Sequence, residues 1–306
     1  MLKTRNISVN NVSYLCSGIK KRNMKDKKKV ILGLLKMRLK SDDEFEKQIM
    51  DLAVKKFENI RNDGWGVYYS KGGKRLVAAK KTIEGVYTVR EDTEEICDKA
   101  FWGCPFLKNV AIPASVKRIG DEAFARCLSL QSVCIPPLVE ELGVNPFVEL
   151  DGKVLNNQSE AFCLEAKMLY NSDRTRLISA LTDAAMVIVP KTVKTIGSMA
   201  FSRRSKLKKV QLPEGLVCIE RDAFSDCDAL EEVTIPASVT TVAPYAFAGC
   251  EKLKKVTFLG AVKDLARTAF SDDFELTTIN VPGGTEKKFR KQLHLTSESE
   301  TLVLSI

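Results

Sequence analysis

The chain has 306 residues, 44% of them hydrophobic, which is enough to bury a sizeable core in one large domain or two ordinary ones. Its longest dense apolar run is the six-residue stretch from Val30 to Leu35. A membrane-spanning helix needs about 20 apolar residues, and the core of a signal peptide about 7 to 15. The sequence therefore predicts no transmembrane segment, and the lack of a recognisable signal peptide predicts a cytoplasmic location.

The positive charge is concentrated in the first 62 residues. The formal net charge is +9, and residues 1–62 hold 16 basic and 7 acidic residues, whereas residues 63–306 hold 32 of each. A basic segment can bind nucleic acid or anionic lipid by charge alone, although a charge run is more often a solvated arm. A basic arm that tethers the chain to nucleic acid or to an anionic membrane is therefore kept as an alternative function.

A helix is predicted near the end of this basic segment. Ser41-Asp42-Asp43-Glu44 has the pattern of a capping box, and apolar residues follow at helical spacing from Phe45 to Ile60. We expect this amphipathic helix to pack on the end of the domain that follows, with binding to a membrane surface as the alternative. Residues 1–62 are thus predicted to form a basic, helical N-terminal extension.

Two related β-hairpins are predicted farther along the chain. "VYYSKGGKRLV" (Val67–Val77) and "MLYNSDRTRLI" (Met168–Ile178) each place apolar strand residues on both sides of a turn-rich centre. The first hairpin, within residues 63–90, is expected to cap the exposed edge of the domain. The second lies within an insertion, residues 148–188.

A 23-residue period dominates the remaining sequence. An Ala-Phe or Pro-Phe pair recurs in seven units, preceded by an aliphatic residue four positions earlier and followed by an LxxVxIP-like stretch. The seven pairs are Ala100-Phe101, Ala123-Phe124, Pro146-Phe147, Ala200-Phe201, Ala223-Phe224, Ala246-Phe247 and Ala269-Phe270. One unit cannot bury its own apolar face, so stacking is expected. The pattern predicts a solenoid with a parallel sheet on one side, short helical turns on the other, and one continuous core.

The repeats are assigned to residues 91–147 and 189–281, and residues 282–306 are expected to form an atypical C-terminal cap, because "VPGGTEKKFRKQL" begins as a unit and then becomes helix-like. In the unit "IGDEAFARC" (Ile119–Cys127) two carboxylates and a thiol stand close together. The other units fill the carboxylate positions with unrelated residues, and the thiol recurs only as a small apolar filler. We interpret this cluster as structural.

Other sequence features also argue against catalysis. The chain has nine cysteines, an odd number, with no CxxC spacing, which disfavours a zinc site and a disulfide framework and favours buried thiols in a reducing compartment. The single histidine, His294, is expected on the surface, and no P-loop, HExxH or GxSxG motif is present. We expect no catalytic residue, no metal site, no cofactor and no small-molecule substrate.

The repeated signature IxxxAFxxCxxLxxVxIP, together with the "LYNSDRTRLI" hairpins, resembles the BspA-like leucine-rich repeat family of bacterial and protozoan surface antigens, over about residues 64–290. The resemblance implies an α/β leucine-rich-repeat solenoid of about seven turns with inserted hairpins. It also implies a non-catalytic adhesion module, displayed on the cell surface or secreted, that binds host matrix or plasma proteins such as fibronectin and fibrinogen.

A binding surface is predicted on the outward side of the sheet. Between the buried strand residues, alternate positions point to solvent and form a ladder of side chains on a rigid face. The predicted protein-binding residues are Lys209, Gln211, Glu232, Thr234, Lys255, Thr257, Thr278 and Asn280.

Overall fold

The computed structural model describes residues 60–150, 154–295 and 301–306. The chain divides into two compact units, residues 1–58 and residues 59–306. The second unit holds all of the described residues. The predicted helix and nearly all of the predicted N-terminal extension, residues 1–62, lie outside the described part of the chain.

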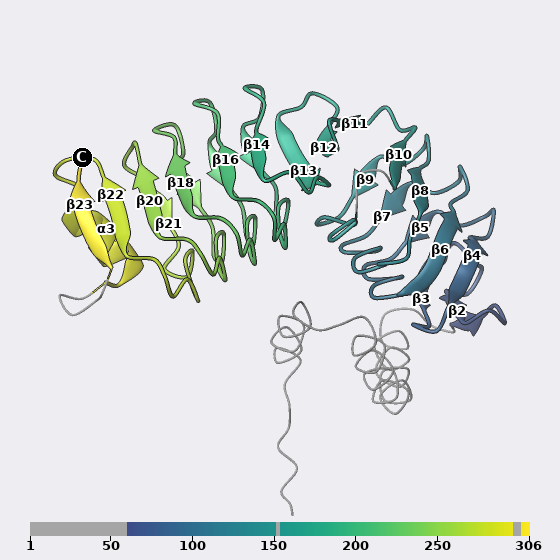
Figure 1. The fold of residues 1–306 in the computed structure, drawn as a ribbon. Helices are drawn as coiled ribbons and strands as arrows, with labels where there is room; N and C mark the ends of the chain where they lie inside the picture. Colours follow the sequence, from purple (N-terminus) through teal and green to yellow (C-terminus); the bar gives the residue numbers. More distant parts are fainter. Residues whose placement is uncertain (1–59, 151–153, 296–300) are drawn as a thin grey trace, which may run out of the picture. The chain divides into compact units, whose positions relative to one another are not determined.

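Each repeat forms one turn of a solenoid with two strands. In a typical turn, the longer strand β18 (Glu232–Ile235) is followed by Pro236, whose carbonyl accepts a hydrogen bond from Val239 N–H at 3.1 Å. The two-residue strand β19 (Thr241–Val242) follows, and the chain returns through the Ala-Phe turn to β20 (Lys255–Phe258). Equivalent strands of successive turns pair in parallel, so the predicted solenoid is confirmed (Figure 1).

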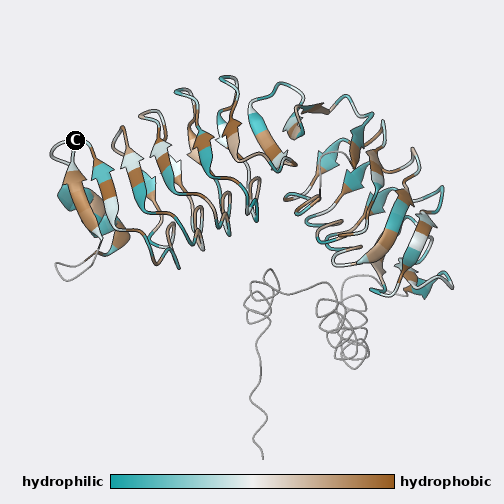
Figure 2. Ribbon diagram, viewed as in Figure 1, coloured by the Kyte–Doolittle hydropathy of each residue, from teal (hydrophilic) through white to brown (hydrophobic). Residues whose placement is uncertain are grey.

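The longer strands form three sheets on one side of the solenoid, in the orders β10-β8-β6-β4, β14-β16 and β18-β20-β22-β23. The remaining bounds are β4 (Glu84–Thr88), β6 (Phe106–Ala111), β8 (Ser132–Ile135), β10 (Leu155–Asn157), β14 (Met186–Ile188), β16 (Lys209–Gln211), β22 (Thr278–Val281) and β23 (Leu302–Ser305). We call this side the long-strand face. Hydrophobic and hydrophilic residues alternate along its strands (Figure 2), because successive side chains point to opposite faces.

The opposite side carries two sheets, in the orders β1-β2-β3-β5-β7-β9 and β11-β12-β13-β15-β17-β19-β21. Their bounds are β1 (Arg61–Asn62), β2 (Val67–Tyr69), β3 (Arg75–Ala79), β5 (Glu95–Ile96), β7 (Arg118–Ile119), β9 (Glu141–Leu142), β11 (Phe162–Glu165), β12 (Met168–Asn171), β13 (Arg176–Ala180), β15 (Thr195–Ile196), β17 (Cys218–Ile219) and β21 (Asp264–Leu265). We call this side the short-strand face. A second sheet thus stands where the sequence predicts only helical turns.

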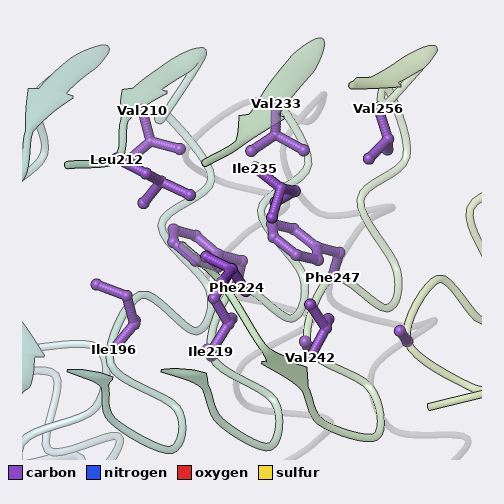
Figure 3. Packing of buried hydrophobic residues seen from close by; sticks show 14 of the residues in the cluster. Ile196, Val210, Leu212, Ile219, Phe224, Val233, Ile235, Val242, Phe247 and Val256 are labelled. Carbon is purple, nitrogen blue, oxygen red and sulfur yellow. The ribbon is translucent and has the colours of Figure 1, made fainter. Parts of the chain in front are cut away.

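The core is divided into two clusters, so the expectation of one continuous core is wrong. The N-terminal stack (β1–β10) buries one cluster and the C-terminal stack (β12–β23) the other. Parallel phenylalanine rings form a column in each, with centroids 5.3 and 6.0 Å apart between Phe101, Phe124 and Phe147. In the C-terminal stack the column runs from Phe201 to Phe270 at 4.7 to 5.5 Å. Figure 3 shows its rings between the aliphatic side chains of the two sheets.

Two further features differ from the sequence prediction. The solenoid has about ten turns rather than seven, because the hairpins and the C-terminal strand add turns that lack the Ala-Phe pair. The Ala-Phe segments are not helical, since left-handed residues flank the pair, as at Met199 (φ 58°) and Arg203 (φ 63°). A helix does not tolerate such residues. Each segment is instead a hydrogen-bonded double turn, with Ala200 N–H donating to Gly197 O and Arg204 N–H to Phe201 O.

The two hairpins are present and each begins a stack. β2 pairs antiparallel with β3, and β12 with β13, in the same register with the same irregularity. β12 also pairs with β11 and lies at the junction of the two stacks. There Leu169 packs into the N-terminal core, while its neighbours Met168 and Tyr170 pack into the C-terminal core.

The C-terminal segment contains the single α-helix of the described residues, α3 (Glu286–Leu293), which buries Phe289 and Leu293. His294 ends this helix in a left-handed conformation and is exposed. β23 then adds a parallel strand to β22. Within the described residues, no helix has the length and apolar character that spanning a membrane requires.

Candidate protein-binding surface

The predicted binding residues lie on the long-strand face of the C-terminal stack. Their neighbours Val210, Val233, Val256 and Ile279 are buried, so the strand alternation turns the predicted residues outward. Lys209, Gln211, Glu232, Thr234 and Lys255 are exposed, and Thr257, Thr278 and Asn280 are partly buried.

Six of these residues form one continuous array. Lys255 stands opposite Glu232 on one side and Thr278 on the other. Thr257 stands between Thr234 and Asn280 and accepts a hydrogen bond from Asn280 Nδ2 at 3.3 Å. Lys209 and Gln211 belong to the adjacent two-stranded sheet, where β16 lies next to β18. The structure therefore brings all eight residues to one face, on two neighbouring sheets.

Exposed apolar side chains flank this array at both ends. Met186 and Ile188 of β14 stand opposite Lys209 and Gln211 and are 51% and 60% exposed. At the other end, Leu302 and Leu304 of β23 are 54% and 45% exposed. We call the eight polar residues and these four apolar residues the ladder surface. Its two ends are apolar and its centre is polar with charges of both signs.

The sequence reasoning missed the apolar ends, although one of them follows from the repeat. Met186 and Ile188 precede Lys209 and Gln211 by 23 residues, so the period places them in the same outward columns. Leu302 follows Thr278 by 24 residues, which is outside the period. Only the paired strand β23 reveals that position.

The two carboxylates of "IGDEAFARC" have structural contacts, Asp121 with the backbone and Glu122 with a lysine. Asp121 Oδ1 accepts the N–H of Val144 in the next turn at 2.8 Å, and Asp98 Oδ1 accepts the N–H of Asp121 at 2.9 Å. Glu122 forms an ion pair with Lys99. Within the described residues, no group of His, Cys, Asp or Glu side chains is arranged to hold a metal ion.

The cysteine column is also structural. Cys127 Sγ donates to Phe101 O at 3.1 Å, and Cys227 and Cys250 repeat the contact with the preceding phenylalanine carbonyls at 3.2 and 3.3 Å. Burial raises the pKa of the Cys127 thiol to about 12, which keeps the sulfur protonated and poorly nucleophilic at neutral pH. Sequence reasoning identified the small buried filler but not this hydrogen bond.

The last position of the same column holds a carboxylic acid. Asp273 is 9% exposed, and its Oδ1 accepts Cys250 N–H at 2.7 Å. Desolvation by burial raises the pKa of Asp273 to about 8, and the charge of Asp272 acts in the same direction. A buried acid that stays protonated at neutral pH takes the place of the cysteine here, and its contact with Cys250 N–H ties it to the preceding turn.

The BspA-type leucine rich repeat model matches the chain in six copies, over residues 87–175 and 180–295. The chain belongs to this family. This confirms the resemblance inferred from the repeated signature. Repeat solenoids of this kind generally present extended surfaces for protein binding and are typically not enzymes.

Solved structures agree with the fold. A leucine rich cell surface protein from Faecalibacterium prausnitzii is 23% identical, with a TM-score of 0.50, over 71% of this chain and 63% of its own length. This chain thus spans less than two thirds of that relative. The pneumococcal vaccine antigen PcpA is 20% identical, with a TM-score of 0.53, over 74% of this chain and 68% of its own length. A leucine-rich repeat protein from Eubacterium ventriosum is 18% identical, with a TM-score of 0.52, over 81% of this chain and 83% of its own length. A search of curated proteins found no match.

Proposed function

We propose that this chain is a non-catalytic protein-binding module of adhesion type, and that the ladder surface contacts the partner. The observation that carries this proposal is the position of the four exposed apolar side chains, two at each end of the polar array. Apolar contacts supply binding free energy, while fixed polar groups between them give specificity. The backbone ladder holds all of these side chains on a rigid scaffold.

The proposed partner is a protein of the host matrix or plasma, such as fibronectin or fibrinogen, as the family resemblance implies. The proposed location is the cell surface or the extracellular space. Two structural relatives are described as a cell surface protein and a vaccine antigen, which favours this location. Nothing in the comparisons supports the cytoplasmic location expected from the sequence. Digestion of intact cells with protease tests the proposed location, because a chain on the cell surface is cut whereas a cytoplasmic chain stays uncut.

Binding of the full chain to immobilised fibronectin and fibrinogen, measured by biolayer interferometry, tests the ladder surface. The double variant Met186→Ser/Ile188→Ser is expected to weaken binding at least about tenfold, because each buried apolar contact contributes on the order of 1 kcal/mol. The matched control is Leu128→Ser/Leu138→Ser, which removes two leucines of the N-terminal stack that are 70% and 52% exposed. If both double variants bind equally well, the ladder surface does not contact the partner.

The alternative function rests on the charge of the N-terminal segment. A basic arm that binds nucleic acid or anionic membrane makes the affinity depend steeply on salt concentration. Deleting residues 1–40, which hold 12 basic residues and one acidic residue, then abolishes binding to DNA and to anionic vesicles, and the ladder variants retain it. The adhesion proposal expects the reverse result for the protein partner, namely that the deletion leaves the affinity unchanged.

A further inference from the structure

A cleft on the short-strand face lies where the two stacks meet. Its cavity has a volume of about 390 Å³ and is lined by residues 140–145 on one side and by side chains of β11, β12 and β13 on the other. Leu142, Phe162 and Ile178 line it, are partly buried and pack against the N-terminal core. The cleft therefore has an apolar floor that is incompletely covered.

β9 borders this cleft with an open edge. In the N-terminal stack, each short strand donates N–H groups to the turn before it. Gly143 N–H donates to Ile119 O at 2.8 Å, and Glu140 N–H donates to Lys117 O at 2.9 Å. By the same register, the carbonyls of Glu140 and Leu142 point away from β7, toward the next position. β9 is the last strand of its sheet among the described residues, so no strand occupies that position.

The outward side chains of these strands alternate in charge. Arg75, Glu95, Arg118 and Glu141 stand opposite one another in successive strands. The ion-pair distances along this row are 3.0, 2.9 and 3.0 Å. The row ends at Glu141, which lines the cleft together with the acidic residues Glu140 and Asp121. A positively charged side chain at the next strand position, opposite Glu141, would continue this alternation.

We infer that the cleft binds an extended peptide segment of a partner protein, in which a Lys or Arg is followed directly by an aliphatic residue. The segment adds a parallel strand to β9. Its N–H groups donate to the carbonyls of Glu140 and Leu142, its basic side chain pairs with Glu141, and its aliphatic side chain covers Leu142. Main-chain hydrogen bonds supply affinity in this mode, and alternate side chains supply specificity.

The cavity volume limits what can enter. Pockets of about 300 to 1,000 Å³ take ligands of small-molecule size. A short stretch of extended chain fits this range, whereas a folded domain does not. Three acidic residues line the cleft, and its two arginines, Arg118 and Arg176, are paired with Glu141 and Glu220. The unbalanced carboxylates disfavour nucleic acid, whose phosphates they repel. This site is separate from the ladder surface, which lies on the other face of the solenoid.

The chain itself provides a probe. Strand β7 carries the required pattern, because Arg118 pairs with Glu141 from the opposite side and Ile119 stands opposite Leu142. A fluorescein-labelled peptide copying residues 115–121, "SVKRIGD", is titrated with the full chain, and binding is followed by fluorescence anisotropy. We expect saturable binding. Replacing the peptide's arginine with glutamate is expected to weaken it at least about tenfold, as loss of a close charge pair does.

A second peptide tests the strand pairing without altering the protein. Sarcosine in place of the peptide's glycine removes the N–H that would donate to Leu142 O, and it keeps charge and apolar contacts. We expect this change to weaken binding about tenfold or more, since it leaves that carbonyl without a partner and adds a methyl group at the pairing edge. Equal affinity of the sarcosine peptide would overturn the added-strand geometry.

Protein variants locate the site. Glu141→Lys is expected to weaken binding of the arginine peptide at least about tenfold and to strengthen binding of the glutamate peptide. Ile178→Trp, which fills the cleft, is expected to weaken both peptides. The matched control is Glu84→Lys, which reverses an exposed charge of β4 on the long-strand face, outside the ladder surface, and leaves peptide affinity unchanged. Circular dichroism verifies that each variant is folded. Absence of saturable binding at millimolar peptide, or equal binding by all three variants, overturns the proposal.

Discussion

The two stacks begin with nearly the same hairpin, yet the two hairpins have different structural roles. In the first, Val67 and Tyr69 are buried and Tyr68 between them is partly exposed, as expected of a strand that caps one core. In the second, the corresponding residues Met168, Leu169 and Tyr170 are all buried. The same backbone motif therefore forms an end cap in one place and a joint between two cores in the other.

A hairpin strand that is buried on one side forms an end cap, whereas a hairpin strand that is buried on both sides joins two cores. Polar contacts reinforce the joint. Asn145 Nδ2 donates to Met199 O at 2.7 Å, Arg204 Nη1 donates to Leu150 O at 3.2 Å, and Arg203 pairs with Glu149 at 3.1 Å. Because neighbouring units carry the stability of a solenoid, this joint determines whether the two stacks unfold together.

The largest effect is expected from truncating the joint. Leu169→Ala should lower the free energy of unfolding by about 3 kcal/mol, because it leaves a cavity in a fully buried site. Tyr68→Ala, at the equivalent position of the first hairpin, should cost about 1 kcal/mol, because that side chain is only partly buried. Urea unfolding followed by circular dichroism measures both. Equal losses would show that the second hairpin is only another cap.

The same experiment reports on coupling between the stacks. Both tryptophans, Trp65 and Trp102, belong to the N-terminal stack, so their fluorescence follows that stack alone. In the native chain, the fluorescence and circular dichroism transitions should coincide. In Leu169→Ala they should separate.

A smaller effect is expected at the far end of the C-terminal stack. The folded-state pKa of Asp273 is about 8 against an ordinary 3.8, so the folded chain holds an extra proton between these values. The free energy of unfolding should therefore fall as pH rises from about 4 to about 8. Asp273→Asn keeps the acceptor for Cys250 N–H but has no proton to lose. The stability of the variant relative to the native chain should therefore increase steadily from pH 5 to pH 8, because only the native side chain carries a proton that is lost over this range. A pH-independent difference would contradict this.

The turns that replace the predicted helices offer a third test. Met199 is left-handed, a conformation that costs a non-glycine residue about 1 to 2 kcal/mol. Met199→Gly should raise the stability by about 0.5 kcal/mol, after the greater chain entropy of glycine is subtracted. Thr268 occupies the same column but is not left-handed. Thr268→Gly should instead lower the stability by about 0.5 to 1 kcal/mol, so the sign of the change distinguishes the two positions in thermal unfolding.

The sequence predicts the repeated part of this fold well, because its residues occupy equivalent environments many times over. The 23-residue spacing of the phenylalanines places them in columns, and the alternation around Val233 and Val256 places the ladder residues on the outer face. Features that occur once are not predictable in this way. Nothing in Leu169 alone shows that it faces a second core, because its burial depends on a contact between segments distant in sequence.

The helical turns were mispredicted for a related reason. Apolar residues at spacings of four and five, as at Ile119, Ala123 and Phe124, suit a helical turn, but they suit a double turn that brings the same residues inward equally well. Only backbone conformation distinguishes the two. Gly103 and Gly249, both left-handed, stand in the column where other units hold arginine, aspartate or glutamate. That glycine recurrence was the available signal.

The smallest effect on stability is expected on the ladder surface, where it separates folding from function. Lys255 stands opposite Glu232 and Thr278, and such cross-strand pairs contribute roughly 0.2 to 1 kcal/mol. Lys255→Thr should therefore change the free energy of unfolding by less than about 0.5 kcal/mol, because threonine suits an exposed strand position. The same change should weaken partner binding measurably. If the variant instead loses stability and keeps its affinity for the partner, Lys255 stabilises the fold and does not contact the partner.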